Sequence, residues 1–437
     1  MIKDYWHRVC RMVREDKLFS SIYISGTALS IAFTMVMAIS YYVKLAPIYP
    51  EANRKHTLYM KHARFQEQQD EASYDAGYSV RAVEEWFYTL KNVEMVSAER
   101  SVPQGSYVRL PDGRGELQVT AKFTDPAFFK IYSFRFIEGS SLSESDFEAG
   151  TLTAVVSDKL ARVVFGSDSC IVGRTLKMGY KNYRICGVVE EASSLAEASY
   201  AQVYVAYNRK ETESMGGRYG VLPYMGRMEV TLLVKSGEQE KALRKELADI
   251  VRRYNASQDA YRLELCGQPT SHFRSVFQDY MSETSLLDSE AVRSLLFVLC
   301  VLLLVPGVNL CGVIAGRMES RVAEMGIRKT FGASRAVLLR EVVNENLVFT
   351  LLGGMFGLVL AWLMLVIFRQ WVFDMLNPFP GNKFIGSSPL VSGEMLFSPV
   401  VFLLVFFFCI VFNLISALVP AWLSLRQPVI KSMNEER

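Results

Sequence analysis

The sequence lacks the motifs that mark most nucleotide-binding and metal-dependent enzymes. No phosphate loop of the form GxxxxGK[ST] occurs, so the chain is not expected to bind ATP by that route. The four histidines (His7, His56, His62 and His272) are scattered, and the sequence contains neither a zinc signature nor a nucleophile elbow. These absences argue against a membrane-anchored enzyme, and we expect no catalytic residue, metal site or bound cofactor in this chain.

Cysteine is also sparse, and the seven cysteines form no metal motif. Three of them, Cys170, Cys186 and Cys266, lie in the polar middle of the chain. A Cys170–Cys186 disulfide is compatible with the spacing, but we expect buried free thiols, since cysteine packs as a small apolar residue. The net charge of +3 gives no argument for a nucleic-acid partner.

Charged residues are missing from four long apolar runs. An uncharged apolar run longer than about 18 residues predicts a transmembrane helix. The runs are Leu18–Val43, Leu295–Ala315, Leu347–Phe368 and Pro399–Trp422. The first run could instead be a secretory signal peptide, but it exceeds the roughly 7–15 residues of a signal core and lacks a convincing cleavage site. We therefore favour four membrane spans.

Lysine and arginine gather on one side of these spans. They are dense in residues 1–17, in the loop 316–346 and in the tail 426–437, whereas the loop 370–398 between the third and fourth spans contains only Lys383. The positive-inside rule then places both termini and the loop 316–346 in the cytoplasm. Residues 1–17 have helical spacing of apolar residues, which favours an amphipathic interfacial helix over a disordered basic leader.

Residues 44–290 follow the first span and carry the pattern of a mixed α/β domain. Thr153–Ser157 is predicted as a strand and Lys159–Phe165 as a helix ended by Gly166. Phe136–Gly139 is predicted as a turn. Strand–helix–strand units on both sides of a β-rich centre predict two lobes, with one lobe inserted at about 117–207. The predicted fold is an α-helical membrane protein with four transmembrane helices and a large extracytoplasmic mixed α/β domain between helices 1 and 2.

The stretch Arg321–Ser334 lies between the second and third spans and reads RVAEMGIRKTFGAS. Glu324 stands four residues before Arg328, a spacing that stabilises a short helix. Gly332 is predicted to end this helix, and its basic residues favour the C-terminal end of the helix dipole. A loop that serves only to carry positive charge needs neither the glutamate nor the Gly-Ala-Ser ending. We therefore predict a handle that another protein binds.

The spans themselves carry little chemistry. Pro306 is expected to kink the second span, and Asn309 is expected to form a hydrogen bond with another helix. Gly353, Gly354 and Gly357 predict close helix packing in the third span. The spans contain none of the buried charges that mark ion or proton pathways. We therefore expect no substrate to cross through a polar channel between them.

These motifs resemble a known family. Glu324-Met325-Gly326-Ile327-Arg328-Lys329, followed by Gly332-Ala333-Ser334, is similar to the E-I-G-I-R-K-x-x-G-A-S signature of MacB/FtsX-type ABC transporter permeases. Met325 replaces the usual isoleucine. The tail, with Pro420-Ala421, Arg426 and Pro428, resembles the closing pattern of the family. In the middle of the chain, several segments resemble the MacB periplasmic core domain: Thr124–Phe129, Gly139, Ser157–Gly166, Val172-Gly173 and Tyr183–Val189.

The resemblance implies a permease domain at 291–425 and a MacB-like periplasmic core domain at 44–290, in a bacterial inner membrane. It implies a homodimer, or a heterodimer with a related permease, bound to a separate cytoplasmic ABC ATPase that holds the ATP. It also admits a periplasmic adaptor and an outer-membrane channel as partners besides membrane lipids. The residues expected to couple to the ATPase are Arg321, Glu324, Gly326, Ile327, Arg328, Lys329, Gly332, Ala333 and Ser334.

Such permeases pass ATP-driven motion to an outer domain that handles a peptide, a drug or a lipoprotein. Two further hypotheses stay open from the sequence. One is an FtsX-like module that activates a periplasmic cell-wall hydrolase. The other is a sensor that pairs with a histidine kinase, although those relatives commonly have ten spans and only four are counted here.

Overall fold

The computed structural model describes most of the chain. The described residues are 17–68, 72–111, 113, 115–208, 223–257, 259–277, 293, 296–298, 300–301, 312, 314–316, 327–328, 330–374 and 398–426. The chain divides into two compact units. The helical unit comprises Met1–Tyr42, Ser294–Val372 and Ser392–Arg437, and the mixed α/β unit comprises Val43–Arg293 and Phe373–Val391.

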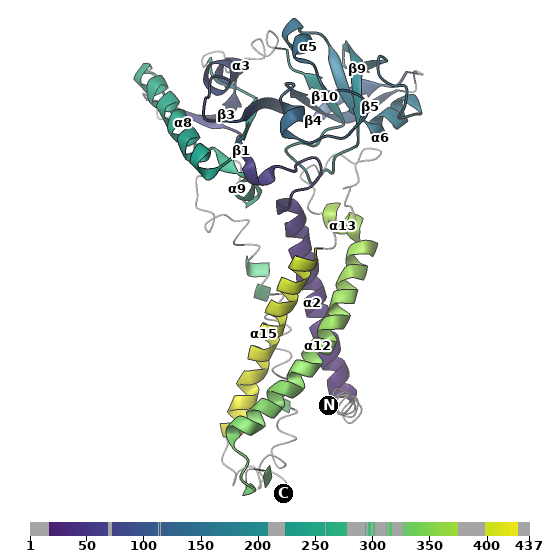
Figure 1. Ribbon diagram of the computed structural model, residues 1–437, viewed down its shortest axis with the longest axis vertical. Helices are drawn as coiled ribbons and strands as arrows, with labels where there is room; N and C mark the ends of the chain where they lie inside the picture. The colour runs from purple at the N-terminus through teal and green to yellow at the C-terminus, as the bar shows by residue number, and fades with distance from the viewer. Residues whose placement is uncertain are drawn as a thin grey trace. The chain divides into compact units, whose positions relative to one another are not determined.

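Three long helices build the described part of the helical unit. They are α2 (Lys17–Leu45), α12 (Arg335–Ile367) and α15 (Pro399–Arg426), and the short helix α13 (Arg369–Asp374) follows α12. Within the helical unit the three long helices run side by side (Figure 1). Each contains a stretch long and apolar enough to cross a membrane, because an 18-residue window in each has high mean hydropathy.

These helices correspond to the first, third and fourth predicted spans. The second predicted span, Leu295–Ala315, lies for the most part outside the described residues, as do the predicted interfacial helix 1–17 and the tail 426–437. Helix α2 extends beyond its predicted span by one residue at the start and two at the end, and α15 ends at Arg426, four residues later than predicted. Helix α12 begins at Arg335, twelve residues before the predicted span, so the second part of the predicted loop 316–346 is helical.

A ten-stranded sheet forms the centre of the mixed α/β unit. Its order is β14-β1-β12-β4-β5-β10-β7-β9-β6, and β8 pairs with both β4 and β9. The strands are β1 (Thr57–Met60), β4 (Met95–Arg109), β5 (Glu116–Thr124), β6 (Phe136–Gly139), β7 (Thr153–Ser157), β8 (Thr175–Met178), β9 (Lys181–Val189), β10 (Val203–Ala206), β12 (Glu229–Leu233) and β14 (Thr270–Ser271). Strands from inside and outside the predicted insertion at 117–207 thus share one sheet.

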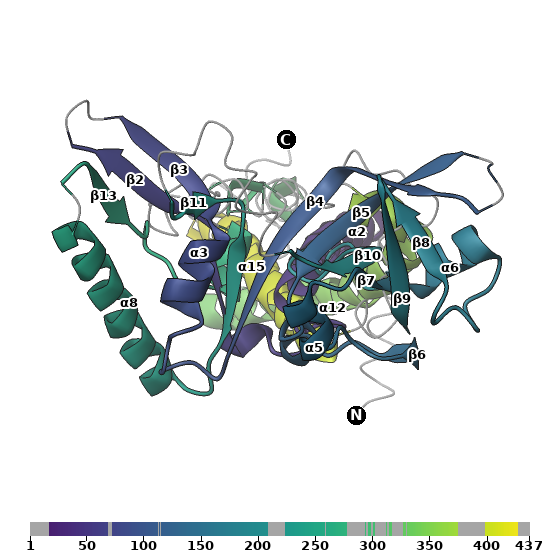
Figure 2. The same ribbon diagram turned by 90° about the horizontal axis from the view of Figure 1, so that it is seen from above.

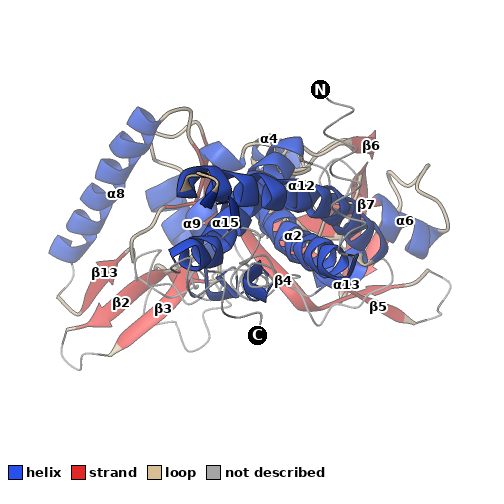
Figure 3. Cartoon of the chain, turned by 90° about the horizontal axis from the view of Figure 1, so that it is seen from below, coloured by secondary structure: helices blue, strands red, loops and turns tan. Residues whose placement is uncertain are grey.

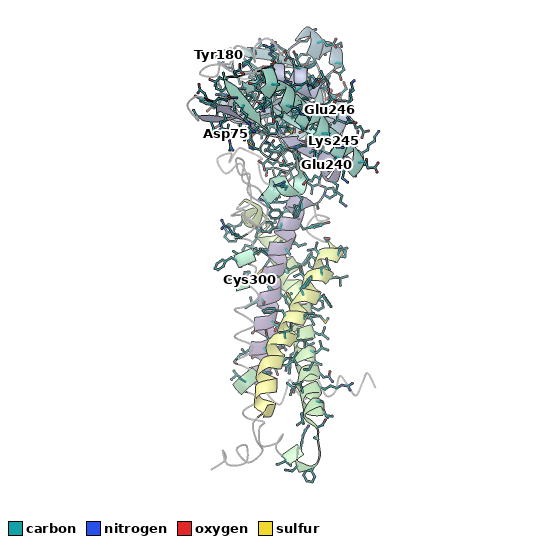
Figure 4. All side chains as sticks on the ribbon, turned by 90° about the vertical axis from the view of Figure 1, so that its left-hand side faces the viewer. Asp75, Tyr180, Glu240, Lys245, Glu246 and Cys300 are labelled. Carbon is teal, nitrogen blue, oxygen red and sulfur yellow. The ribbon has the colours of Figure 1, made fainter. Side chains whose placement is uncertain are left out.

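A second sheet has four strands in the order β11-β3-β2-β13. They are β2 (Ala63–Glu67), β3 (Ser73–Tyr78), β11 (Met225–Gly226) and β13 (Tyr261–Glu264). Helix α8 (Gly237–Ser257) lies along this sheet, as Figures 2 and 3 both show. It buries an apolar stripe that includes Leu243 and Leu247, whereas Lys245 is exposed (Figure 4). An amphipathic helix of this kind is held mainly by its buried stripe.

Short helices connect the strands. They are the 3₁₀ turn η1 (Arg54–His56), α3 (Val80–Ala82) with the π-helical turn η2 (Val83–Phe87), α4 (Phe128–Ile131), α5 (Glu144–Ala149), α6 (Asp158–Phe165) and α9 (His272–Phe277). Helix α6 begins at Asp158, one residue before the predicted start, where the Ser157 hydroxyl accepts the N–H of Leu160. It ends at Phe165 as predicted, and Gly166 follows at φ +75°.

Two other expectations are corrected. Phe136–Gly139 is not a turn but the edge strand β6, paired with β9. Cys170, Cys186 and Cys266 are free thiols, as expected, but only Cys266 is buried, whereas Cys186 is partly buried and Cys170 is exposed. Its backbone lies at φ +59°, in the left-handed region.

Candidate functional site

The predicted handle falls partly within the described residues. The structure describes Ile327, Arg328, Gly332, Ala333 and Ser334, while Arg321, Glu324, Gly326 and Lys329 lie outside the described residues. We call residues 327–334 the Gly332 turn. The described part lies immediately before α12, so the turn and the helix form one continuous piece of structure.

Backbone hydrogen bonds close the Gly332 turn. The N–H of Phe331 donates to the carbonyl of Ile327 at 3.2 Å, and the N–H of Ala333 donates to that of Arg328 at 3.0 Å. Gly332 lies at φ +92°, a conformation that glycine adopts without the strain of a Cβ atom. The second bond and the left-handed glycine together are typical of a helix C-terminal cap. Gly332 therefore ends this helical turn, as predicted.

Ser334 begins the next helix. Its hydroxyl accepts the N–H of Val337 at 3.4 Å, with Ser334 in the extended conformation of an N-cap. Ala333 packs against an apolar cluster of the helical unit that includes Tyr23 of α2 and Phe349 of α12. The Gly-Ala-Ser sequence thus ends one helical turn, anchors it and starts α12, which leaves the turn little freedom to move apart from α12.

An ion pair fastens the turn to the side of α12. Nη1 of Arg328 donates to both carboxylate oxygens of Glu341, at 3.0 and 2.9 Å. Because both side chains are about half exposed, the pair contributes only about 0–1 kcal/mol to stability. Its main effect is to orient the turn. The sequence predicted Glu324 as the partner of Arg328, and Glu324 lies outside the described residues.

The turn presents apolar side chains to its surroundings. Phe331 is 88% exposed and Ile327 is 55% exposed, and Val337 on the first turn of α12 is 59% exposed. Large apolar residues concentrated on a short polar loop commonly mark an interaction surface. The sequence analysis missed Phe331, although a phenylalanine between a basic run and a glycine was a visible signal.

Glycines bring α12 into contact with both neighbouring helices. A Cβ atom at Gly353 would lie 2.8 Å from Cβ of Thr27, and one at Gly357 would lie 2.8 Å from the carbonyl oxygen of Ala28, both on α2. Gly354 faces the ring of Phe406 on α15 instead. The predicted small-residue face is confirmed, and it serves two partners. Small residues allow this close approach in membrane helices.

The early start of α12 adds buried polar groups that the sequence analysis did not anticipate. Glu345 and Asn346 are both buried, and the Asn346 amide donates to the carbonyl of Val342 at 2.9 Å. They lie one and two residues before Leu347, and the predicted span was restricted to an uncharged apolar run, so it began after them. Their helical spacing with Val342 and Phe349 was the signal that could have extended the helix.

The mixed α/β unit contains buried titratable groups that offer an alternative candidate site. Burial raises the pKa of Asp125 to about 6, although Tyr88, Ser97 and the N–H groups of Ala98 and Phe128 donate to it. Every one of these bonds ties Asp125 to a neighbouring element. The bond from Phe128, the first residue of α4, is 3.0 Å long.

Glu191 is a second buried carboxyl in this unit. Burial raises its pKa to about 7, with the nearby Lys159 ammonium opposing the shift. The Ser157 hydroxyl donates to Glu191 at 3.3 Å while it also caps α6. Among the residues that the structure describes, no group of three or more His, Cys, Asp or Glu side chains could hold a metal ion. These carboxyls therefore fit a structural role.

Comparison with known proteins gives matches for both units. Residues 20–250 match the model of the MacB-like periplasmic core domain, and residues 296–429 match that of the FtsX-like permease C-terminal domain. The two matches follow the division of the chain into a first span with an outer domain and a second membrane part.

Individual relatives agree with these matches. The chain is 24% identical over 247 residues to the uncharacterized ABC transporter permease YknZ of Bacillus subtilis (strain 168), covering 56% of this chain and 57% of YknZ. It is 24% identical over 259 residues to the macrolide export ATP-binding/permease protein MacB of Pasteurella multocida (strain Pm70), covering 59% of this chain and 37% of MacB. The chain thus spans less than two thirds of the length of these relatives.

A solved structure is also similar in part. The crystal structure of the extracellular domain of YknZ from Gram-positive bacteria is 16% identical and aligns with a TM-score of 0.33, covering 48% of this chain and 99% of that domain.

Proposed function

Because the chain belongs to the MacB/FtsX family of ABC transporter permeases, we propose that it transmits the ATP-driven motion of a separate ATPase to an outer domain. The outer domain is the mixed α/β unit, and its substrate is a peptide, a drug or a lipoprotein. ATP is held by the ATPase subunit, and the permease itself is not catalytic. Two copies of this chain, or one copy and a related permease, complete the complex.

The observation that carries the proposal is the exposed apolar surface of the Gly332 turn. Phe331 projects from a turn whose backbone is fixed by a glycine cap, an N-cap and the Arg328–Glu341 pair. A rigid aromatic side chain loses little conformational entropy on binding and fills a pocket well. This arrangement suits docking into a groove of a cytoplasmic partner.

The helical unit offers a route for the motion. The Gly332 turn starts α12 directly, and α12 packs closely on α2 through Gly353 and Gly357. A push on the turn would therefore displace α12 and α2 together, because closely packed helices shift as rigid elements. The predicted spans carry no charged residue, so the substrate is handled outside the bilayer.

The proposed orientation has both termini and the Gly332 turn in the cytoplasm of a bacterium, with the mixed α/β unit beyond the inner membrane. The exposed thiol of Cys170 can test this orientation. We expect a membrane-impermeant maleimide to label Cys170 in cells with a permeabilised outer membrane. When Cys170 is replaced and a cysteine is introduced by Phe331→Cys, the new thiol at position 331 should not be labelled. Labelling of both positions would contradict the orientation.

Photocrosslinking from the turn tests the docking directly. A benzoyl-phenylalanine at position 331 should crosslink in cells to a nucleotide-binding ABC subunit, identified by mass spectrometry. The same probe at the fully exposed Tyr180, in the mixed α/β unit (Figure 4), should not capture that subunit. Crosslinks from position 331 to lipid alone would show that Phe331 contacts the membrane and would contradict the proposal.

A further inference from the structure

A buried arginine holds the end of helix α2. The last residues of α2, from Val43, belong with Val43–Arg293 to the mixed α/β unit. Arg54 lies in the same unit and is only 3% exposed. Nη1 of Arg54 donates to the carbonyls of Val43, Lys44 and Ala46, at 3.1, 3.0 and 2.5 Å. These are carbonyls that a helix C-terminus leaves without partners. One guanidinium therefore caps the end of α2.

The same guanidinium also contacts the loop between β9 and β10. Nη2 of Arg54 donates to the carbonyl of Leu195 at 3.3 Å, and Nε donates to Glu51 at 2.7 Å. The other carboxylate oxygen of Glu51 accepts the N–H and the hydroxyl of Ser199, both at 2.9 Å. The Arg54–Glu51 pair thus binds this loop, residues 195–199, at two places.

The central sheet binds the loop from the other side. The ammonium of Lys122, on β5, donates to the carbonyl of Ala198. Lys122 is itself paired with Glu99 of β4 at 2.8 Å, with both side chains buried. The loop 195–199 therefore bridges two buried ion pairs, one at the end of α2 and one within the sheet.

His272 adds a second hold on the helix end. Its Nε2 lies 2.9 Å from the carbonyl of Lys44, which can only accept, so Nε2 carries the proton. Burial lowers the pKa of His272, which favours the neutral ring. Nδ1 then accepts from the hydroxyl of Tyr59 on β1, at 3.2 Å. His272 is the first residue of α9, so the helix end is joined to both the entry and the exit segment of the unit.

We propose that Arg54 is the positioning residue that passes displacement of α2 to the central sheet, through the loop 195–199 and Lys122. The inference rests on the proposed function, which supplies the displacement. A helix end followed by a solvated linker would absorb movement in the linker. Here the end of α2 is held by charge-assisted hydrogen bonds, which are shorter and stronger than neutral ones. Burying two ion pairs costs desolvation energy, so the pairs are weak contributors to stability. Their placement between the end of α2 and the sheet is better explained if they fix the position of the loop 195–199.

Hydrogen–deuterium exchange of the intact complex tests the inference. The complex is purified through a tag on this chain, placed in lipid nanodiscs, and compared without nucleotide and with ATP plus vanadate. In the wild type, vanadate trapping should change exchange both at the Gly332 turn and at 195–199. Arg54→Lys keeps a charge beside Glu51, but a single ammonium cannot also reach the helix end and Leu195. The variant should keep the response at the turn and lose the response at 195–199.

Controls separate positioning from folding. In Arg54→Lys without nucleotide, amides at 195–199 should exchange about tenfold faster, as expected from the loss of about one charge-assisted hydrogen bond, while β7 and β10 stay protected. The matched control is Arg135→Lys, since Arg135 pairs with Glu190 on the surface of the same unit. It should behave as the wild type. If Arg54→Lys does not fold, His272→Leu removes one neutral bond to the helix end and should weaken the same response.

The outcomes are distinguishable. A wild-type response at 195–199 in Arg54→Lys overturns the inference. A wild type that responds at the Gly332 turn but not at 195–199 also overturns it and leaves the proposed function intact. A wild type that responds at neither segment overturns the proposed function and the inference together.

Discussion

The hydroxyl of Tyr23 on α2 lies 3.0 Å from the hydroxyl of Thr350 on α12, with both side chains buried. The Tyr23 ring also packs on Phe349, with centroids 5.7 Å apart. This hydrogen bond lies on the same side of α12 as Gly353 and Gly357, and together they join the two helices that the proposed function requires to move as one.

Substitutions in this contact should weaken it in a graded way. Tyr23→Phe removes one interhelical hydrogen bond and should destabilise the protein by about 0.6–1 kcal/mol. Gly353→Ala should cost more, because its Cβ would lie too close to Thr27. Thermal unfolding in detergent measures both. The control is Gly26→Ala, where a Cβ meets no atom within 4 Å. Equal effects of Gly353→Ala and Gly26→Ala would contradict the close packing.

The Gly332 turn should be sensitive to backbone strain and not to side-chain size. A Cβ at Gly332 meets no atom within 4 Å, but φ is +92°. Gly332→Ala and Gly332→Leu should therefore both cost about 1–2 kcal/mol in local strain and uncouple the ATPase without unfolding the outer domain. Gly332→Asn should be milder, since asparagine tolerates the left-handed region. ATP hydrolysis by the reconstituted complex measures coupling, and unchanged hydrolysis in the alanine variant would refute the role of the turn.

The Arg328–Glu341 pair should matter for coupling more than for stability. Arg328→Glu and Glu341→Arg should each lower coupled ATP hydrolysis, while the unfolding temperature stays close to that of the wild type because the pair is exposed. The double exchange should restore much of the activity. A double variant no better than either single variant would show that the pair does not orient the turn. Glu324→Arg stays a prediction of uncoupling, since Glu324 lies outside the described residues.

Stability should fall as the pH rises from about 5 to 8. The folded-state pKa of Glu191 is raised to about 7 by burial, whereas the unfolded value stays near the ordinary one. The native state therefore binds a proton that the unfolded state has lost, and this contribution disappears as the pH rises through 7. Glu191→Gln should flatten the dependence of the thermal midpoint on pH. Glu190→Gln, at an exposed neighbouring carboxyl, should leave it unchanged; equal slopes in all three proteins would contradict the assignment.

Much of the fold followed from local patterns. Thr153–Ser157 was predicted with the observed bounds, because turn residues flank a short run of β-forming residues. Strand β3 was missed, since its sequence SYDAGY is polar and contains glycine. Strand β6 was predicted as a turn and ends in a glycine, Gly139, which lies at φ +72°.

The site was predictable in position but not in its contacts. The glycine cap at 332 follows from one residue and its neighbours, whereas the Arg328–Glu341 pair joins residues 13 positions apart across a reversal of the chain. Arg54 was missed altogether. Its sequence neighbours give no sign that it is buried, because the carbonyls it binds come from an earlier helix end and a loop 141 residues further on.

The most direct test of the central claim is the binding of the ATPase subunit to a Phe331→Asp variant, measured by co-purification from membranes together with ATP hydrolysis. A charge on this 88% exposed residue should not disturb folding, and Tyr180→Asp in the mixed α/β unit is the matched control. The account predicts that Phe331→Asp loses the ATPase by at least about tenfold, as for a binding hot spot, while Tyr180→Asp retains it. Full retention of a coupled ATPase by Phe331→Asp would contradict the account.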